Sequence, residues 1–225
     1  MAERTLILAS ASPRRLELMP LLELPWSAQA ADVDEASVSH PDPERDVVET
    51  ASLKARFIAN NAPGNSVVIG ADTIVVLDKE KLGKPAGEDE ARVMLEALRG
   101  RSHQVHTGIS IIDRGSGKIV MDVSSVPVPM RYYSDDEIEA YIATGDPLDK
   151  AGAYAIQHSG LKPVVNLGGC FATVVGLPLC HLKRALIQLD ITTSAEVPCS
   201  CQSHFNYDCP VFEQILNGQS DFGTF

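Results

Sequence analysis

The 225-residue sequence has no long hydrophobic run. No stretch approaches the roughly 18 to 20 consecutive apolar residues that a membrane-spanning helix requires, so we expect no membrane as a partner. The N-terminus, MAERTLILAS, also lacks the apolar core and small-residue cleavage site of a secretory signal. Together, these absences favour a cytoplasmic location.

Positive charge is scarce as well, because 19 Lys and Arg residues are outnumbered by 30 Asp and Glu residues, for a net charge of −11. Proteins that bind nucleic-acid polymers neutralise phosphates with a broad basic surface, so the charge balance argues against such a polymer as partner. It does not exclude a small phosphate ligand in a local basic pocket. Cysteine is limited to five residues, an odd number that favours thiols over a disulfide framework.

The most informative segment that is present is VVIGADTIVVL, at Val67–Leu77, in which only Asp72 ionises. A run this apolar and β-branched predicts a strand that is covered on both faces. A carboxylate in its middle costs several kcal/mol if no cation or metal compensates its charge. The rest of the chain must therefore bring a compensating charge to Asp72.

A strand, a Ser-rich loop and a helix start follow one another near the N-terminus. Thr5–Ala9 predicts the strand, Ser12 suits the helix N-cap, and Pro13 suits the first helical position. Arg14 and Arg15 are misplaced for the helix dipole, which prefers acids there, and this misplacement indicates a polyanion between them. The alternative is a capped helix with two solvated arginines. Pro20 is expected to kink or end this helix.

Another cation, Lys54, falls on the apolar face of a predicted amphipathic helix at residues 43–61, together with Val47, Ala51 and Ile58. The ammonium either extends to solvent along its aliphatic stem or neutralises a buried acid. Further on, Gly and Pro around Lys84 predict a fixed loop, although no Walker pattern is present.

An acidic loop holds Asp32, Asp34 and Glu35. Such a cluster is either a solvated surface or a set of ligands for a hard metal. Later, the segment at 147–157 carries Asp149, Lys150 and Gln157 around small residues, which suggests a close approach of backbone or ligand. The Gln157 amide offers both a donor and an acceptor to a nucleobase edge, or simply faces water.

The remaining patterns complete one continuous α/β domain, because no repeat or low-complexity linker interrupts them. They predict a charged turn at 79–81, a helix at 87–99, strands at 105–112 and 119–130, a helix with a capping box from Ser134 to about 143, and a final helix at about 181–189. We place the domain at residues 1–191 and a Cys-containing tail at 192–225.

The tail has the residue types of a zinc site in Cys199, Cys201, His204 and Cys209, but their spacing is not a common one. A partly ordered tail is the preferred interpretation.

Taken together, the motifs resemble the Maf family, nucleoside triphosphate pyrophosphatases also known as septum-formation inhibitor proteins. The resemblance spans the first strand to about residue 189 and rests on SASPRR at 10–15, Glu35, LKA around Lys54, GADT at 70–73, GKP at 83–85, HTG at 106–108, DKAG at 149–152 and VGLP at 175–178. Pro20 and the Cys-containing tail depart from the family pattern.

The resemblance implies a Maf/ITPase-like fold, with a mixed twisted sheet, flanking helices and two lobes around a nucleotide cleft, usually in a homodimer. It implies hydrolysis of a nucleoside triphosphate to a monophosphate and pyrophosphate, with Mg²⁺ or Mn²⁺ as cofactor. Asp72 matches the proton acceptor, and Glu35 and Asp72 match the metal-binding residues. The substrate-binding positions are Ser10, Ser12, Arg14, Arg15, Lys54, Thr73, Lys84 and Gln157.

Base preference is the finer part of this expectation. Arg14, Thr73 and Gln157 match positions tied to base selection, and Gln157 resembles the branch that acts on dTTP and UTP, whereas the branch that acts on 7-methyl-GTP typically has a glutamate there. Two other functions stay open: a non-catalytic nucleotide-binding regulator of cell division, and a phosphomonoesterase that releases orthophosphate. The isolated buried carboxylate beside a phosphate site argues against a pure binder.

Overall fold

A computed structural model describes residues 4–218, so the last seven residues of the predicted tail lie outside the described part of the chain. A six-stranded sheet forms its centre, in the order β2-β1-β3-β5-β6, with β4 paired to β3. The strands are β1 (Thr5–Leu8), β2 (Trp26–Ala28), β3 (Ser66–Leu77), β4 (Glu80–Leu82), β5 (Ser102–Asp113) and β6 (Ile119–Pro129). No helix within residues 4–218 is long and apolar enough to cross a membrane.

The sheet mixes both strand directions, as the family resemblance implies. β1 runs parallel to β2 and β3, whereas β3, β4, β5 and β6 pair antiparallel. The charged turn predicted at 79–81 is wrong in part, because Glu80–Leu82 pairs with Val75–Leu77 as a hairpin strand. Only Asp78 and Lys79 make the turn, with φ of 51° and 72°, and neither residue is the glycine or asparagine that usually signals such a turn.

One edge of β3 is only partly covered by other strands. β1 pairs with its residues 66–69 and β4 with its residues 75–77, so residues 70–74 carry no strand on that side. The opposite edge is paired with β5 from residue 67 to residue 76. The gap in strand pairing contains Asp72, and it leaves room for a cleft between the two ends of the molecule.

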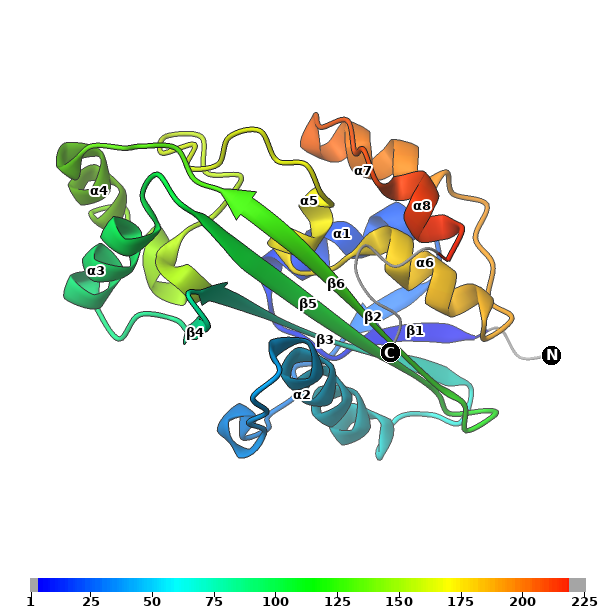
Figure 1. Ribbon diagram of the computed structural model, residues 1–225. Coiled ribbons are helices and arrows are strands. Elements are labelled where there is room, and N and C mark those ends of the chain that lie inside the picture. Colours follow the sequence, from blue (N-terminus) through cyan, green and yellow to red (C-terminus); the bar gives the residue numbers. More distant parts are fainter. Residues whose placement is uncertain (1–3, 219–225) are drawn as a thin grey trace.

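Helix α2 (Pro43–Ala59) packs across one face of β3 and β5 (Figure 1). The predicted helix at 43–61 is confirmed apart from its last two residues. Two glycines of the sheet allow the close approach: a Cβ at Gly70 would lie 2.0 Å from the Ala51 carbonyl oxygen, and one at Gly108 would lie 2.6 Å from the Val47 carbonyl carbon. This packing buries the inward face of α2, including Lys54.

The other helices form the opposite face and a second lobe. Helix α1 (Pro13–Leu18), the 3-10 turn η1 (Met19–Leu22), α5 (Phe171–Val175) and α6 (Leu179–Ile187) belong to the main hydrophobic core. Helices α3 (Glu88–Leu98) and α4 (Asp135–Ile142) lie with β4 at the other end of the long strands (Figure 1). The short 3-10 turns are η2 (Glu35–Ser37), η3 (Asp146–Asp149) and η4 (Ala151–Ala153). Pro20 ends α1 as predicted, and the chain continues as η1.

The tail forms two further helices, α7 (Val197–Phe205) and α8 (Phe212–Leu216). Both pack against α6, and Val197 and Ile215 are fully buried in the main core. The predicted partly ordered tail is therefore wrong for residues 192–218. Its few apolar residues are spread among Ser, Cys, Asn and Gln, so the sequence shows no clear helical period, yet these residues meet on one docked face.

Candidate active site

A cleft of about 1110 Å³ opens between the two lobes, along the uncovered edge of β3. Residues from both lobes line it: the loop after β1, the inward face of α2, β3, the loop after β4, and the segment that contains η3 and η4. The structure brings all the predicted site residues to this cleft: Ser10, Ser12, Arg14, Arg15, Glu35, Lys54, Asp72, Thr73, Lys84 and Gln157.

Lys54 joins two carboxylates in the cleft. Its Nζ lies 2.7 Å from Asp72 Oδ1 and 2.9 Å from Glu35 Oε2. Asp72 is only 9% exposed, whereas the Glu35 side chain is 56% exposed. Of the two interpretations of Lys54, the geometry selects the one in which the inward ammonium neutralises the buried acid of β3.

Burial governs the proton affinity of Asp72. The loss of solvent raises the pKa of this carboxyl, while Lys54 and Arg15 oppose the rise. A carboxylate with a raised pKa holds a proton more firmly than an exposed one, which is the property of a general base. Asp72 thus combines access to the cleft with enhanced basicity.

The donor set at Asp72 and Glu35 suits a hard divalent cation only in part. Among residues 4–218, no group of three His, Cys, Asp or Glu side chains is placed to hold a metal ion. This also leaves the Cys199, Cys201, His204 and Cys209 interpretation without support. Mg²⁺, however, is commonly held by one or two carboxylates, with water and substrate phosphates as its other ligands. Glu35 and Asp72 fit that arrangement.

Arg15 binds the protein itself, although the sequence predicts a substrate contact. Its Nε donates to the Gly176 carbonyl at 2.8 Å, one terminal nitrogen donates to Ser10 Oγ at 3.4 Å, and the other donates to Thr73 Oγ1 at 3.1 Å. The loss of solvent around this guanidinium lowers its pKa, while Asp72 opposes the shift. Arg15 therefore fixes the loop after β1 to β3 and to the end of α5.

Thr73 continues this contact into the core. Its hydroxyl lies 2.9 Å from Thr107 Oγ1, and the Thr107 hydroxyl donates to the Thr173 carbonyl at 2.8 Å. Since each hydroxyl has one hydrogen, Thr73 must donate to Thr107 while it accepts from Arg15. Side chains alternate along a strand, so Thr73 points away from the face that carries Asp72.

The loop after β1 is also held by its own serines. The Ser12 N–H donates to Ser10 Oγ at 3.1 Å, and Ser12 caps α1 without a side-chain hydrogen bond to the helix. Arg14 and Lys84 differ from Arg15, because within the described part of the chain no hydrogen bond or ion pair engages their side chains. These two cations face the cleft from opposite lobes and remain available to a polyanion.

The far end of the cleft contains a cluster that the predicted site omits. Buried Lys150 pairs with Asp149 Oδ1 at 2.6 Å and with Asp146 Oδ1 at 2.9 Å, and the Tyr141 hydroxyl donates to Asp146 Oδ2 at 2.6 Å. Gln157 lies exposed on the segment that follows. The DKAG motif signals Asp149 and Lys150, whereas Asp146 and Tyr141 carry no signal in the sequence because the fold alone brings them together.

Known proteins resemble this chain over most of its length. Residues 5–189 match the family described as Maf-like protein. A dTTP/UTP pyrophosphatase of Geotalea uraniireducens (strain Rf4) is 44% identical over 185 residues, 82% of this chain and 95% of that protein. A dTTP/UTP pyrophosphatase of Bacillus cereus (strain B4264) is 42% identical over 188 residues, 84% of this chain and 97% of that protein.

Among solved structures, a HAM1 protein from Coxiella burnetii aligns with a TM-score of 0.47 at 16% identity, over 95% of this chain and 97% of that chain. The family match includes every strand and every residue predicted for the site, and it ends before α7 and α8. The chain belongs to the Maf family.

Proposed function

We propose that the protein hydrolyses nucleoside triphosphates, with dTTP and UTP preferred, to a nucleoside monophosphate and pyrophosphate. The observation that carries this proposal is a buried carboxylate of raised pKa, Asp72, in a cleft that also presents Arg14 and Lys84, two cations that no hydrogen bond or ion pair engages within residues 4–218. The base preference is supported by the names of relatives that are 42–44% identical over most of the chain.

The cations bind and orient the triphosphate. Arg14 offers a planar fork for two phosphate oxygens, and Lys84 offers a compact charge from the other lobe. Arg15 is a positioning residue, because its contacts with Ser10, Thr73 and Gly176 hold the phosphate-binding loop in place. Phosphoryl transfer depends chiefly on such positioning and charge compensation.

Asp72 accepts the proton of the attacking water. The water oxygen bonds to the α-phosphorus, the bond from that phosphorus to the bridging oxygen breaks, and pyrophosphate leaves. Lys54 keeps Asp72 in place and stabilises its charge before the proton arrives. Glu35 shares the same ammonium, so the two carboxylates stand beside each other at the reaction centre.

A divalent cation, Mg²⁺ or Mn²⁺, would be held by Glu35 and Asp72, and when bound it offsets the negative charge of the phosphates. At the other end of the cleft, the Gln157 amide supplies a donor and an acceptor that complement a pyrimidine edge. The Lys150 cluster supports the segment that carries Gln157. A homodimer, which the family resemblance implies, and a cytoplasmic location, which the sequence favours, remain part of the proposal.

A product assay tests the proposal. Purified protein with Mg²⁺ or Mn²⁺ is incubated with dTTP, UTP, CTP, GTP and 7-methyl-GTP, and pyrophosphate is resolved from orthophosphate. We expect pyrophosphate from dTTP and UTP, and a loss of about 10²- to 10⁴-fold in turnover for Asp72→Asn. Asp190→Asn is the matched control and should leave turnover unchanged, because Asp190 is exposed, does not line the cleft, and has a φ of 57° that asparagine also adopts.

Other outcomes would redirect the proposal. Release of orthophosphate alone would indicate a phosphomonoesterase, and pyrophosphate mainly from another base would overturn the role of Gln157. Absence of turnover with every nucleotide would favour the non-catalytic regulator.

A further inference from the structure

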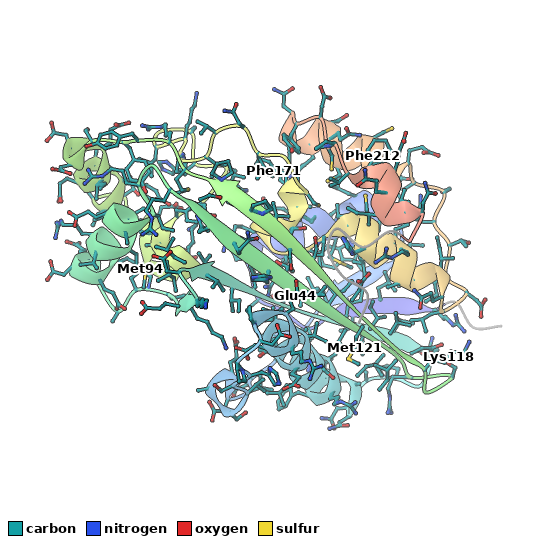
Figure 2. The ribbon with its side chains drawn as sticks, viewed as in Figure 1. Glu44, Met94, Lys118, Met121, Phe171 and Phe212 are labelled. Carbon is teal, nitrogen blue, oxygen red and sulfur yellow. The ribbon has the colours of Figure 1, made fainter. Side chains whose placement is uncertain are left out.

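A second, much smaller cavity of about 10 Å³ lies where the tail meets α5 and α6. Four of the five cysteines line it: Cys170, Cys180, Cys201 and Cys209. Figure 2 labels Phe171 of α5 and Phe212 of α8, which belong to its walls. The fifth cysteine, Cys199, is exposed on α7. The tail therefore brings its thiols to those of the Maf domain.

Two of these thiols contact each other across the junction. Cys170 is the N-cap residue of α5 and is buried, whereas Cys209 lies between α7 and α8 and is partly exposed. Both thiols line the small cavity, and a side-chain hydrogen bond with Cys209 is the largest cause of the raised pKa of Cys170. A disulfide needs its two sulfurs about 2.05 Å apart, so thiols in hydrogen-bond contact require only a small displacement to join.

Surrounding contacts keep the segments that carry Cys170 and Cys209 in place. The backbone N–H of Cys209 donates to Gln202 Oε1 at 2.9 Å. The Tyr207 hydroxyl lies 2.8 Å from the carbonyl oxygens of both Leu167 and Gly169, just before Cys170. The Phe171 ring packs on the Phe205 ring with centroids 4.5 Å apart. These contacts tie the tail to the start of α5 on both sides of the pair.

We propose that Cys170 and Cys209 form a thiol-oxidation site, at which a peroxide converts the two thiols into a disulfide between the tail and α5. Hydrogen peroxide transfers one oxygen to the Cys209 sulfur, which becomes a sulfenic acid, and one water leaves. The Cys170 sulfur then attacks the Cys209 sulfur, and the expelled hydroxide takes the Cys170 proton as a second water. The thiols lose two electrons and the peroxide gains them.

The order of the two steps follows from exposure. The hydrogen bond with Cys209 and burial raise the pKa of the Cys170 thiol well above its ordinary value, so Cys170 is slow to react with peroxide. Cys209 is the more accessible partner and reacts first. The raised pKa also slows the attack of Cys170, but its contact with Cys209 gives Cys170 an advantage over Cys180 and Cys201, whose pKa burial likewise raises to about 12.

The disulfide would act on the cleft wall as well as on the tail. Val174 and Val175 of α5 line the cleft, and the Gly176 carbonyl after α5 accepts from Arg15. A covalent link at the N-cap of α5 therefore anchors the element that positions Arg15. This inference does not depend on the proposed reaction, since none of the four thiols lines the cleft.

Peptide mapping tests the proposal directly. The full-length protein is treated with hydrogen peroxide, its remaining thiols are alkylated, and the digest is analysed by mass spectrometry with and without reduction. We expect a Cys170–Cys209 cross-link that dithiothreitol reverses, with Cys180 and Cys201 still recovered as alkylated thiols. The oxidised protein should melt about 5–10 °C higher than the reduced protein.

The variants separate this pair from its neighbours. Cys209→Ser and Cys170→Ser should each abolish the cross-link and the gain in Tm, whereas Cys199→Ser, at an exposed thiol outside the cavity, should retain both. A Cys180–Cys201 link, five reactive thiols after treatment, or irreversible oxidation of Cys209 without a link would each overturn the proposal. If a variant fails to fold, the presence or absence of the Cys170–Cys209 cross-link in the wild-type protein still tests the proposal.

Discussion

The Lys54 ammonium pairs with both Asp72 and Glu35 in the cleft. An ammonium and a carboxylate that are both buried stabilise a protein only if neither is left unpaired, since an orphaned buried charge costs roughly 3–5 kcal/mol. Glu35 is a second acceptor for Lys54, so Asp72→Asn would not leave the ammonium without a partner. The loss of turnover expected for that variant therefore reports chemistry, not unfolding.

The guanidinium of Arg15 yields a prediction on stability. Lysine in its place reaches at most one of the acceptors Gly176 O, Ser10 Oγ and Thr73 Oγ1, so Arg15→Lys should lower the free energy of unfolding by about 2 kcal/mol. Chemical denaturation measures this loss. Arg14→Lys is the matched control and should raise KM with little change in stability. Equal stability of the two variants would refute the positioning role of Arg15.

Single residues were predictable to different degrees. Asp72 stood out because an acid interrupts an apolar strand, and Lys54 because it falls on an apolar helix face. Arg15 and Thr73 were assigned to the substrate, and the structure shows both in a hydrogen-bond chain that leads into the core. The partners of that chain, Thr107 and Thr173, come from distant segments, and pattern alone does not show which donors they satisfy.

At the scale of elements, the seating of α2 on the sheet determines where Lys54 meets Asp72. Gly70→Ala would place a Cβ 2.0 Å from the Ala51 carbonyl, a backbone atom that moves only with the helix. We expect a loss of about 3 kcal/mol in the free energy of unfolding and a lower kcat, because Lys54 shifts with α2. Denaturation and turnover measure both effects.

The control for this change is Gly64→Ala, since nothing lies within 4 Å of a Cβ at Gly64. It should leave stability and turnover near the wild-type values. Wild-type behaviour of Gly70→Ala would show that α2 does not lie as close to β3 as the structure places it.

The start of α4 gives a prediction on pH. The hydrogen bond from Arg131, with the Ser134 N–H bond of the capping box, lowers the pKa of Glu137 to about 2. Because the pKa of Glu137 is lower in the folded state than its ordinary value of 4.5, the ionised carboxylate stabilises the fold at pH values above 4.5. This contribution is lost as the pH falls toward 2. Glu137→Gln keeps an oxygen for the cap but loses the ion pair.

We therefore expect Glu137→Gln to melt about 1–3 °C below the wild type at pH 7, a small effect because the pair is solvent-screened. The difference should shrink as the pH falls below about 4.5. Thermal melts over this range measure it, with the exposed Glu17→Gln as control. A difference independent of pH would contradict the assigned cause.

Elements with strong local signals were predictable. The capping box at Ser134, the apolar strand around Asp72 and the amphipathic helix of Lys54 are all present in the structure. β4 was not, because three residues of mixed charge become a strand only by pairing with β3. Tertiary contact decides the structure of such short segments, so local propensity does not reveal them.

At the scale of the whole molecule, three long strands, β3, β5 and β6, connect two lobes (Figure 1). The cleft lies along the edge of β3 where residues 70–74 lack a strand neighbour. The family resemblance implied this two-lobed arrangement, and the structure confirms the mixed sheet and the cleft. The docking of the tail was beyond prediction, since it lies outside the family match and depends on apolar residues scattered between polar ones.

The docked tail should contribute to the stability of the whole chain. Ile215→Ala removes a fully buried side chain from the main core, so we expect a loss of about 2–5 kcal/mol in the free energy of unfolding. Ile187→Ala, the same change at a residue that is 49% exposed, should cost much less. Denaturation curves compare the two. Equal losses would show that the tail does not share the core.

In the proposed reaction, water attacks the α-phosphorus of a nucleoside triphosphate in this cleft, with Asp72 as base. Hydrolysis of UTP in ¹⁸O-labelled water, followed by mass spectrometry of both products, tests it most directly. We expect one ¹⁸O atom in the monophosphate, none in pyrophosphate, and a loss of this incorporation in Asp72→Asn. Label in pyrophosphate or in orthophosphate would rule out this reaction, because the attack would then fall on another phosphorus.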